Sequence, residues 1–198
     1  MKRYDYYEGL KKLARKVRAE YGLTTPRVLQ SDMRNIYADR GIRLDVRKLG
    51  RKVRGAYFND ECGVDVVIAE GLPEDPTVFT MAHELKHDLV DKKKPLSLCT
   101  NKNQSSEIEI GAEVFAAEMI FPEPDFIAAM KSMDVKIGKC APEDLVRLKA
   151  TTQTTLSYAG LKKRAVWLKF AARDAFANVR SWSAIHRRLY GPGAKPRR

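Results

Sequence analysis

The sequence predicts an α+β fold: a small antiparallel β-sheet packed against helices in the middle of the chain, followed by a helical C-terminal part. Three observations predict this fold. Apolar residues recur with the helical period over the first 40 residues, alternate with polar residues from 42 to 69, and return to helical spacing from residue 76 onward. The 198 residues are 44% hydrophobic and 31% charged, which argues against disorder, collagen and a disulfide scaffold.

Two helices are expected before the sheet. Apolar residues recur every three or four positions from residue 4 to 21, and Gly22 follows as a stop signal. A second helix is expected to begin at Ser31, a residue type that caps helix N-termini, and to end at Gly41. Both helices have one apolar face, so each is expected to pack on the core.

Three strands are expected next. Residues 42–46 alternate apolar and polar side chains, as a strand with one buried face does. Residues 53–58 and 64–69 are also rich in strand-forming types and flank a segment, 59–63, that contains Asn, Asp and Gly. We therefore expect a hairpin and a small antiparallel sheet.

The remainder is expected to be helical. Pro76 suits the first turn of a helix that carries TVFTMAHELKHDLV and ends near the lysines at 92–94. Residues 96–104 are polar and are expected to form a loop, and the serines at 105–106 offer an N-cap for a helix over 107–120. Further helices are expected at 123–133, 142–150, 155–171 and 173–190.

Charge is distributed unevenly along the chain. The net charge is +12, and residues 161–198 hold eleven basic residues and one acidic residue. We therefore divide the chain into a main domain with N-terminal helices over 1–160 and a basic helical extension over 161–198, packed on the same domain.

Compartment is inferred from hydropathy and cysteine usage. No apolar run is long enough to cross a bilayer, and the first residues lack the apolar segment of a secretory signal. Cys62, Cys99 and Cys140 form no CxxC pair, which favours reduced thiols that pack in the interior. We expect a cytoplasmic protein without a membrane segment.

The segment 83–87, His-Glu-Leu-Lys-His, is the strongest chemical motif. Residues four apart lie on one face of a helix, so His83 and His87 can bind one metal ion, and imidazole is a preferred zinc ligand. Glu84 lies at the edge of that face, where it can hold the attacking water as a general base. Zinc lowers the pKa of such a water to about 7. The motif therefore predicts metal-assisted hydrolysis.

A third protein ligand is expected to be a carboxylate, because no third histidine follows in the HxxGxxH arrangement. The helix over 107–120 carries four glutamates. Glu109 and Glu113 lie at the edge of its apolar face, whereas Glu107 and Glu118 are expected to point toward water. A buried-edge carboxylate is costly without a partner, and a metal ion is one such partner. The pattern leaves Glu109 and Glu113 as alternatives.

These motifs resemble the ImmA/IrrE family of metallo-endopeptidases. FTMAHELKH, followed about twenty residues later by IExxAxxFAAExxxP, is similar to the family's FxxAHELxH and ExxANxFAxxLLMP. The resemblance covers roughly residues 53–125, and the segments upstream of the motif resemble the family's short sheet. It implies a gluzincin-like zinc peptidase over the main domain, with the family's glycine replaced here by Lys86.

The resemblance also implies roles for individual residues. Aligning the second motif puts Glu109 on the family's zinc-ligand glutamate and Glu113 where the family has Asn or Asp. Glu113 is then expected to orient a zinc-bound histidine, or alternatively to bind the metal itself. Asp88 is a further candidate for orienting a ligand, although a solvated position on the helix surface is the favoured interpretation. Tyr158, Arg164 and His186 are candidate donors to the transition-state oxyanion, and we favour Tyr158.

The function that the resemblance implies is regulatory. Such a peptidase is expected to cleave a transcriptional repressor or another specific protein, within a phage or mobile-element circuit. The basic C-terminal helix, with Arg187 and Arg188 beside an apolar stripe, supports an alternative: a nucleic-acid-associated or partner-binding module that keeps the metal site without proteolysis.

Overall fold

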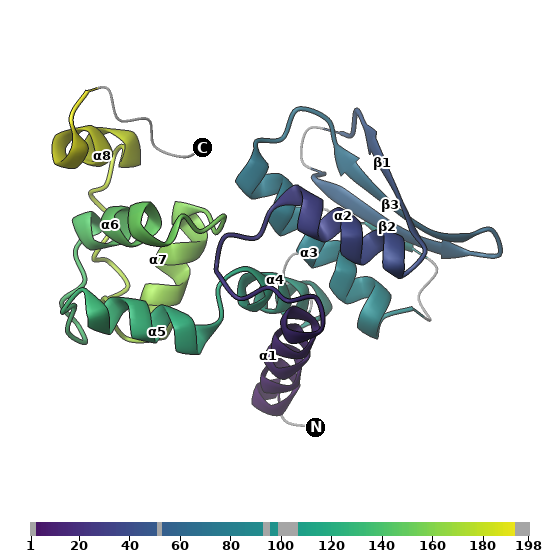
Figure 1. Cartoon of the computed structure of the whole chain (residues 1–198), viewed down its shortest axis with the longest axis horizontal. Helices are drawn as coiled ribbons and strands as arrows, with labels where there is room; N and C mark the ends of the chain where they lie inside the picture. Colours follow the sequence, from purple (N-terminus) through teal and green to yellow (C-terminus); the bar gives the residue numbers. More distant parts are fainter. Residues whose placement is uncertain (1–2, 51–52, 93–95, 99–106, 193–198) are drawn as a thin grey trace. The chain divides into compact units, whose positions relative to one another are not determined.

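The computed structural model describes residues 3–50, 53–92, 96–98 and 107–192 (Figure 1). The chain forms two compact units, one of residues 1–24 and 28–120 and the other of residues 25–27 and 121–198. The division falls at 120/121, whereas the sequence analysis divided the chain near 160. The reason is that α6 packs against α5, α7 and α8.

The first unit is α+β, as predicted. In chain order its elements are α1 (Arg3–Glu20), α2 (Gln30–Asp39), β1 (Ile42–Arg47), β2 (Gly55–Asp60), β3 (Gly63–Ala69), α3 (Glu74–Val90), β4 (Leu96–Leu98) and α4 (Glu107–Ile120).

The sheet has the strand order β1-β3-β2-β4 and is mixed. The predicted hairpin is present, since β2 runs antiparallel to β3 with Asp60 opposite Gly63, and Gly63 has a φ of 119°. However, β1 runs parallel to β3, from Ile42 opposite Val64 onward. The expectation of antiparallel pairing therefore fails for β1, because side-chain alternation reports which face is buried and not the direction of the neighbouring strand.

Two further differences concern the segment between α3 and α4. The structure has a short strand, β4, at 96–98, where the sequence predicted loop, and β4 pairs antiparallel with β2. Three residues are too few to show periodicity, so this strand depends on its partner in the sheet. The predicted N-cap serines at 105–106 lie outside the described residues.

Helices α2 and α3 cover one face of the sheet (Figure 1). The core between them is apolar and includes Ile36, Val66, Ile68, Met81 and Leu85, all essentially inaccessible to solvent. Tyr37 is also fully buried, and its hydroxyl donates a hydrogen bond to the carbonyl of Met81 at 2.7 Å. This contact attaches α2 to the helix that carries both histidines.

Helix α1 packs along α4, and a glycine allows the close approach. A Cβ at Gly111 would lie 2.9 Å from Leu10 and 3.0 Å from Tyr6. Near the far end of α4, the buried Arg18 donates to the carbonyls of Met119 and Ile120 at 2.8 and 3.3 Å. These contacts satisfy carbonyls that the last turn of a helix leaves without partners.

The second unit is helical. It contains α5 (Glu123–Ser132), α6 (Pro142–Thr152), α7 (Tyr158–Trp167) and α8 (Trp182–Tyr190). The predicted helices at 155–171 and 173–190 are longer than α7 and α8, because residues 168–181 form turns. Lys169 adopts a φ of 62°, and the carbonyls of Lys169 and Phe170 accept hydrogen bonds from Gly138 and Cys140, both at 2.9 Å. These tertiary contacts replace the helical bonds.

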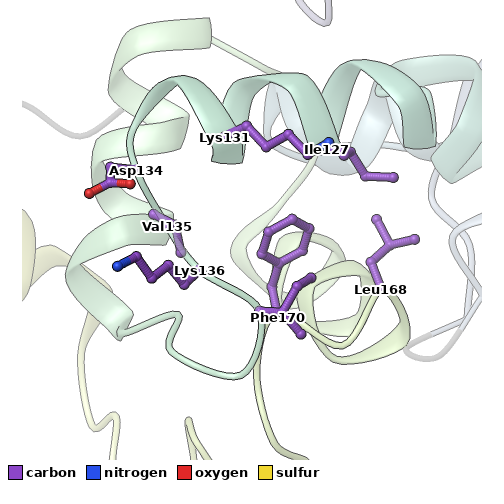
Figure 2. A pocket seen from close by; sticks show the side chains of 8 residues that line it. Ile127, Lys131, Asp134, Val135, Lys136, Leu168 and Phe170 are labelled. Atoms are coloured by element: carbon purple, nitrogen blue, oxygen red, sulfur yellow. The ribbon is translucent and has the colours of Figure 1, made fainter.

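A cavity of about 540 Å³ lies in the second unit, between the end of α5 and the turn after α7. Figure 2 shows the side chains of Ile127, Leu168 and Phe170 facing this space. Its lining is mainly apolar and includes none of the predicted metal ligands.

Within the described residues, no helix combines the length and the apolar composition that crossing a membrane requires.

Candidate metal centre

Helices α3 and α4 bring three predicted ligands together. His83 and His87 are four residues apart on α3, and their ring centroids are 5.3 Å apart. Glu109 lies in the first turn of α4, 3.2 Å from His83 Nε2 through Oε2 and 3.7 Å from His87 Nε2 through Oε1. Among the described residues these three form the one group whose donor atoms lie close enough together to hold a metal ion.

The distances from Glu109 to the two histidines suit a tetrahedral metal ion such as zinc. Zinc is bound by histidine nitrogen and carboxylate oxygen at about 2.0–2.2 Å, so two ligand atoms in a tetrahedral site are separated by roughly 3.4 Å. The observed separations of 3.2 and 3.7 Å bracket this value. Two histidines and one glutamate also leave one position open, as in catalytic zinc sites.

His87 is oriented by a carboxylate that the sequence analysis did not single out. Its Nδ1 atom lies 2.8 Å from Asp91 Oδ2, and the backbone N–H of Asp91 donates to the carbonyl of His87 as α3 ends. A proton on Nδ1 directed at Asp91 leaves Nε2 with its lone pair toward Glu109. The signal was available in the sequence, because Asp91 follows His87 at the i+4 spacing that puts two side chains in contact.

Of the two residues predicted to orient a ligand, Asp88 has other partners, whereas the orienting role of Glu113 stays a prediction. Asp88 is buried and forms ion pairs with Arg40 at 2.7 Å and Lys92 at 3.2 Å, so it links α3 to the end of α2. Glu113 lies one turn beyond Glu109 and is partly exposed. Its oxygens are not within the cluster of donor atoms formed by the histidines and Glu109.

The electrostatics of the cluster favour a bound cation. His83 is desolvated, which disfavours its charged form, but the hydrogen bond to Glu109 and the charges of Glu84, Glu109 and Glu113 more than offset this and raise its pKa. Burial also disfavours the charged form of Asp91, which would raise its pKa. The hydrogen bonds from His87 and Lys86 outweigh burial and lower the pKa of Asp91. The carboxylates around the two histidines thus favour a positive charge at the site.

The side chain of Glu84, on α3, lies next to Gly55, the first residue of β2. Its side chain is fully buried, and a Cβ at Gly55 would be 2.6 Å from Glu84 Oε1 and 2.5 Å from Thr80 Cγ2. Glycine at position 55 therefore makes room for the carboxylate beside the strand. The prediction that Glu84 acts as the base stays a prediction, and its position next to His83 on the same helix is compatible with it.

The three candidate donors to the oxyanion lie in the second unit. Tyr158 stacks on Trp182 with centroids 4.7 Å apart and planes 3° apart, and Lys149 Nζ is 5.7 Å from its ring. Arg164 and His186 are buried. The role given to Tyr158 stays a prediction.

Among the glutamates of α4, Glu107 is exposed as expected, but Glu118 is fully buried and pairs with Arg15 of α1.

A His-His-Glu cluster built from an HExxH helix and the helix that follows it is a site of the metallopeptidase type. The family model described as the IrrE N-terminal-like domain, peptidase family M78, matches residues 39–159. The chain therefore belongs to this family. A search of curated proteins gave no match.

Proposed function

We propose that this protein is a zinc-dependent endopeptidase that cleaves a specific protein partner, such as a transcriptional repressor, in a phage or mobile-element circuit. The observation that carries the proposal is the convergence of His83, His87 and Glu109 beside Glu84 on the HExxH helix. Family membership supports peptidase chemistry, and the ligand types support zinc.

The division of labour follows from the residues. His83, His87 and Glu109 would hold the ion, which supplies Lewis-acid activation of water and of the scissile carbonyl. Glu84 removes a proton from the attacking water and then delivers it to the leaving amine. Asp91 holds the His87 ring in the tautomer whose Nε2 can bind a metal. Tyr158 is proposed to donate to the oxyanion.

The ligand set is tested by elemental analysis of purified protein. We expect close to one zinc per wild-type chain, loss of zinc in Glu109→Ala, and retention in Glu113→Ala. The reverse pattern would make Glu113 the third ligand. Absence of metal from wild type, even after reconstitution with zinc, would contradict the proposal.

The chemistry is tested with Glu84→Gln, which is nearly isosteric and is not a ligand. New protein N-termini are compared in cells that express wild type or the variant. The proposal predicts cleavage products that depend on wild type and are absent with Glu84→Gln, although both chains hold zinc. Identical sets of N-termini, or an unchanged biological output, would argue against proteolysis.

A second function is proposed from charge. In α8 the exposed Arg187 and Arg188 lie on a helix whose other face includes the buried His186, and Arg188 pairs with Glu143 of α6. A basic face of this kind can contact nucleic-acid phosphates. Titration of a DNA duplex at increasing salt tests this function, which predicts affinity that falls steeply with ionic strength. No binding at low salt would exclude it.

A further inference from the structure

Lys86 is the most unusual side chain near the candidate metal centre. It lies between the two histidines in sequence, and its side chain has no exposed surface, although lysine is seldom fully buried without a partner. Burying an ammonium group is costly unless hydrogen bonds and opposite charge compensate for the lost water. The position therefore requires specific partners.

The partners of Lys86 come from three helices. Its Nζ donates at 2.6 Å to Oδ2 of Asp91, the residue that caps the C-terminus of α3, and at 3.1 Å to the carbonyl of Ile108 on α4. The same atom lies 6.0 Å from the centre of the Tyr6 ring on α1. Lys86 thus links the helix of the histidines to the residue that immediately precedes Glu109.

The oxygen that accepts from Lys86 is also the one that faces His87. Asp91 Oδ2 lies 2.6 Å from Lys86 Nζ and 2.8 Å from His87 Nδ1. A carboxylate with two donors on one oxygen has little freedom to rotate, and the ammonium charge keeps it ionised as an acceptor for the imidazole N–H.

We propose that Lys86 is a positioning residue for the metal site: it fixes the Asp91 carboxylate against His87 and holds the start of α4, with Glu109, against α3. The inference rests on the proposed metal site and concerns metal affinity rather than peptide cleavage. Removing a group that orients a ligand commonly weakens metal binding by about 10- to 100-fold.

The first test measures zinc affinity by competition with a chromophoric chelator, without any peptide substrate. Lys86→Met keeps the length and apolar stem but removes the charge and the donors, and it is expected to weaken zinc binding by about 10- to 100-fold. Lys149→Met is the matched control. Lys149 is also buried and donates to two carbonyls, those of Thr154 and Leu156, but it lies in the second unit. The zinc affinity of the Lys149→Met variant is expected to equal that of wild type.

A double-mutant cycle with Asp91→Asn separates positioning from general stability. If Lys86 acts through Asp91, Lys86→Met weakens zinc binding strongly in wild type but only slightly in a chain that already carries Asp91→Asn. If the two losses multiply in full, Lys86 does not act through Asp91 and the proposal is wrong.

Wild-type protein provides a readout that does not depend on a variant that folds. In NMR spectra the ammonium ¹⁵N resonance of Lys86 is expected to shift when zinc is added, while that of Lys149 stays in place. An unmoved Lys86 resonance, or wild-type zinc affinity in Lys86→Met, would overturn the inference. If Lys86→Met weakens zinc binding but the wild-type protein shows no proteolysis, the inference about Lys86 is upheld and the proposed peptidase function is contradicted. A wild-type chain that binds no zinc would overturn both.

Discussion

Replacing Gly55 by alanine tests whether β2 makes room for the Glu84 carboxylate. The added methyl group would lie 2.5 Å from Thr80 Cγ2 and 2.6 Å from Glu84 Oε1. Contacts between carbon atoms are most favourable near 3.5–4.0 Å, so the strand or the two side chains must move by about 1 Å. Forcing an extra methyl group into a packed site costs about 1–3 kcal/mol.

This cost can be measured in the hairpin itself. A loss of about 1–3 kcal/mol corresponds to hydrogen exchange that is roughly 5- to 150-fold faster for the protected amides of β2 and β3. Tryptophan fluorescence is unsuitable, because both tryptophans, Trp167 and Trp182, lie in the second unit. Exchange followed by mass spectrometry resolves the hairpin peptides directly.

Gly160→Ala provides the control for crowding. Its Cβ would lie 2.6 Å from Leu156 Cδ1, but Gly160 is in the second unit, so exchange in the hairpin should stay at the wild-type rate. Because Glu84 is not among the clustered donor atoms, Gly55→Ala should also keep its zinc affinity. Wild-type protection of the hairpin in Gly55→Ala would refute the reasoning.

The remaining predictions concern packing and ionisation. Arg18→Met removes two hydrogen bonds from a buried cation to carbonyls at the end of α4 and should lower the free energy of unfolding by about 1.5–3 kcal/mol in denaturant titrations; a loss below 0.5 kcal/mol, within the usual range for surface substitutions, would show that water replaces them. Tyr37→Phe removes the bond to Met81 and should cost about 1 kcal/mol in the same assay, and no loss would contradict the proposed attachment of α2 to α3. Burial raises the pKa of the Cys140 thiol to about 12, so at pH 8 iodoacetamide should modify the exposed Cys62 first, and equal rates would contradict this. Between the ordinary thiol pKa of 9.0 and about 12, the unfolded chain loses the Cys140 proton while the folded chain keeps it, so stability should fall with rising pH in that window.

Short-range spacing explains what was predicted correctly. The i+4 interval of His83 and His87 on an amphipathic helix determines that both rings share a face, whatever the rest of the chain does. The hairpin of β2 and β3 follows from two apolar runs around a turn segment for the same local reason. In contrast, the sequence predicted that all three cysteines pack in the interior, but Cys62 is exposed and Cys99 lies outside the described residues.

Long-range partners explain what the sequence analysis missed. Glu118 was expected to face water because its helix position lies away from the apolar stripe, yet Arg15 of α1 covers it. Asp88 is likewise buried by Arg40, which is 48 residues away in the chain. Helical periodicity cannot reveal such pairs, because it describes one helix and not the neighbour that packs on it.

The sequence by itself determined the two histidines, the adjoining glutamate and the alternation of helices and strands, because these depend on spacing within single elements. Only the tertiary structure decided which glutamate of α4 lies beside the histidines, that β1 runs parallel to β3, and that Asp91 and Lys86 form a buried network behind His87. Those features require segments distant in the chain to meet, and their geometry is set by how α1, α3 and α4 pack together.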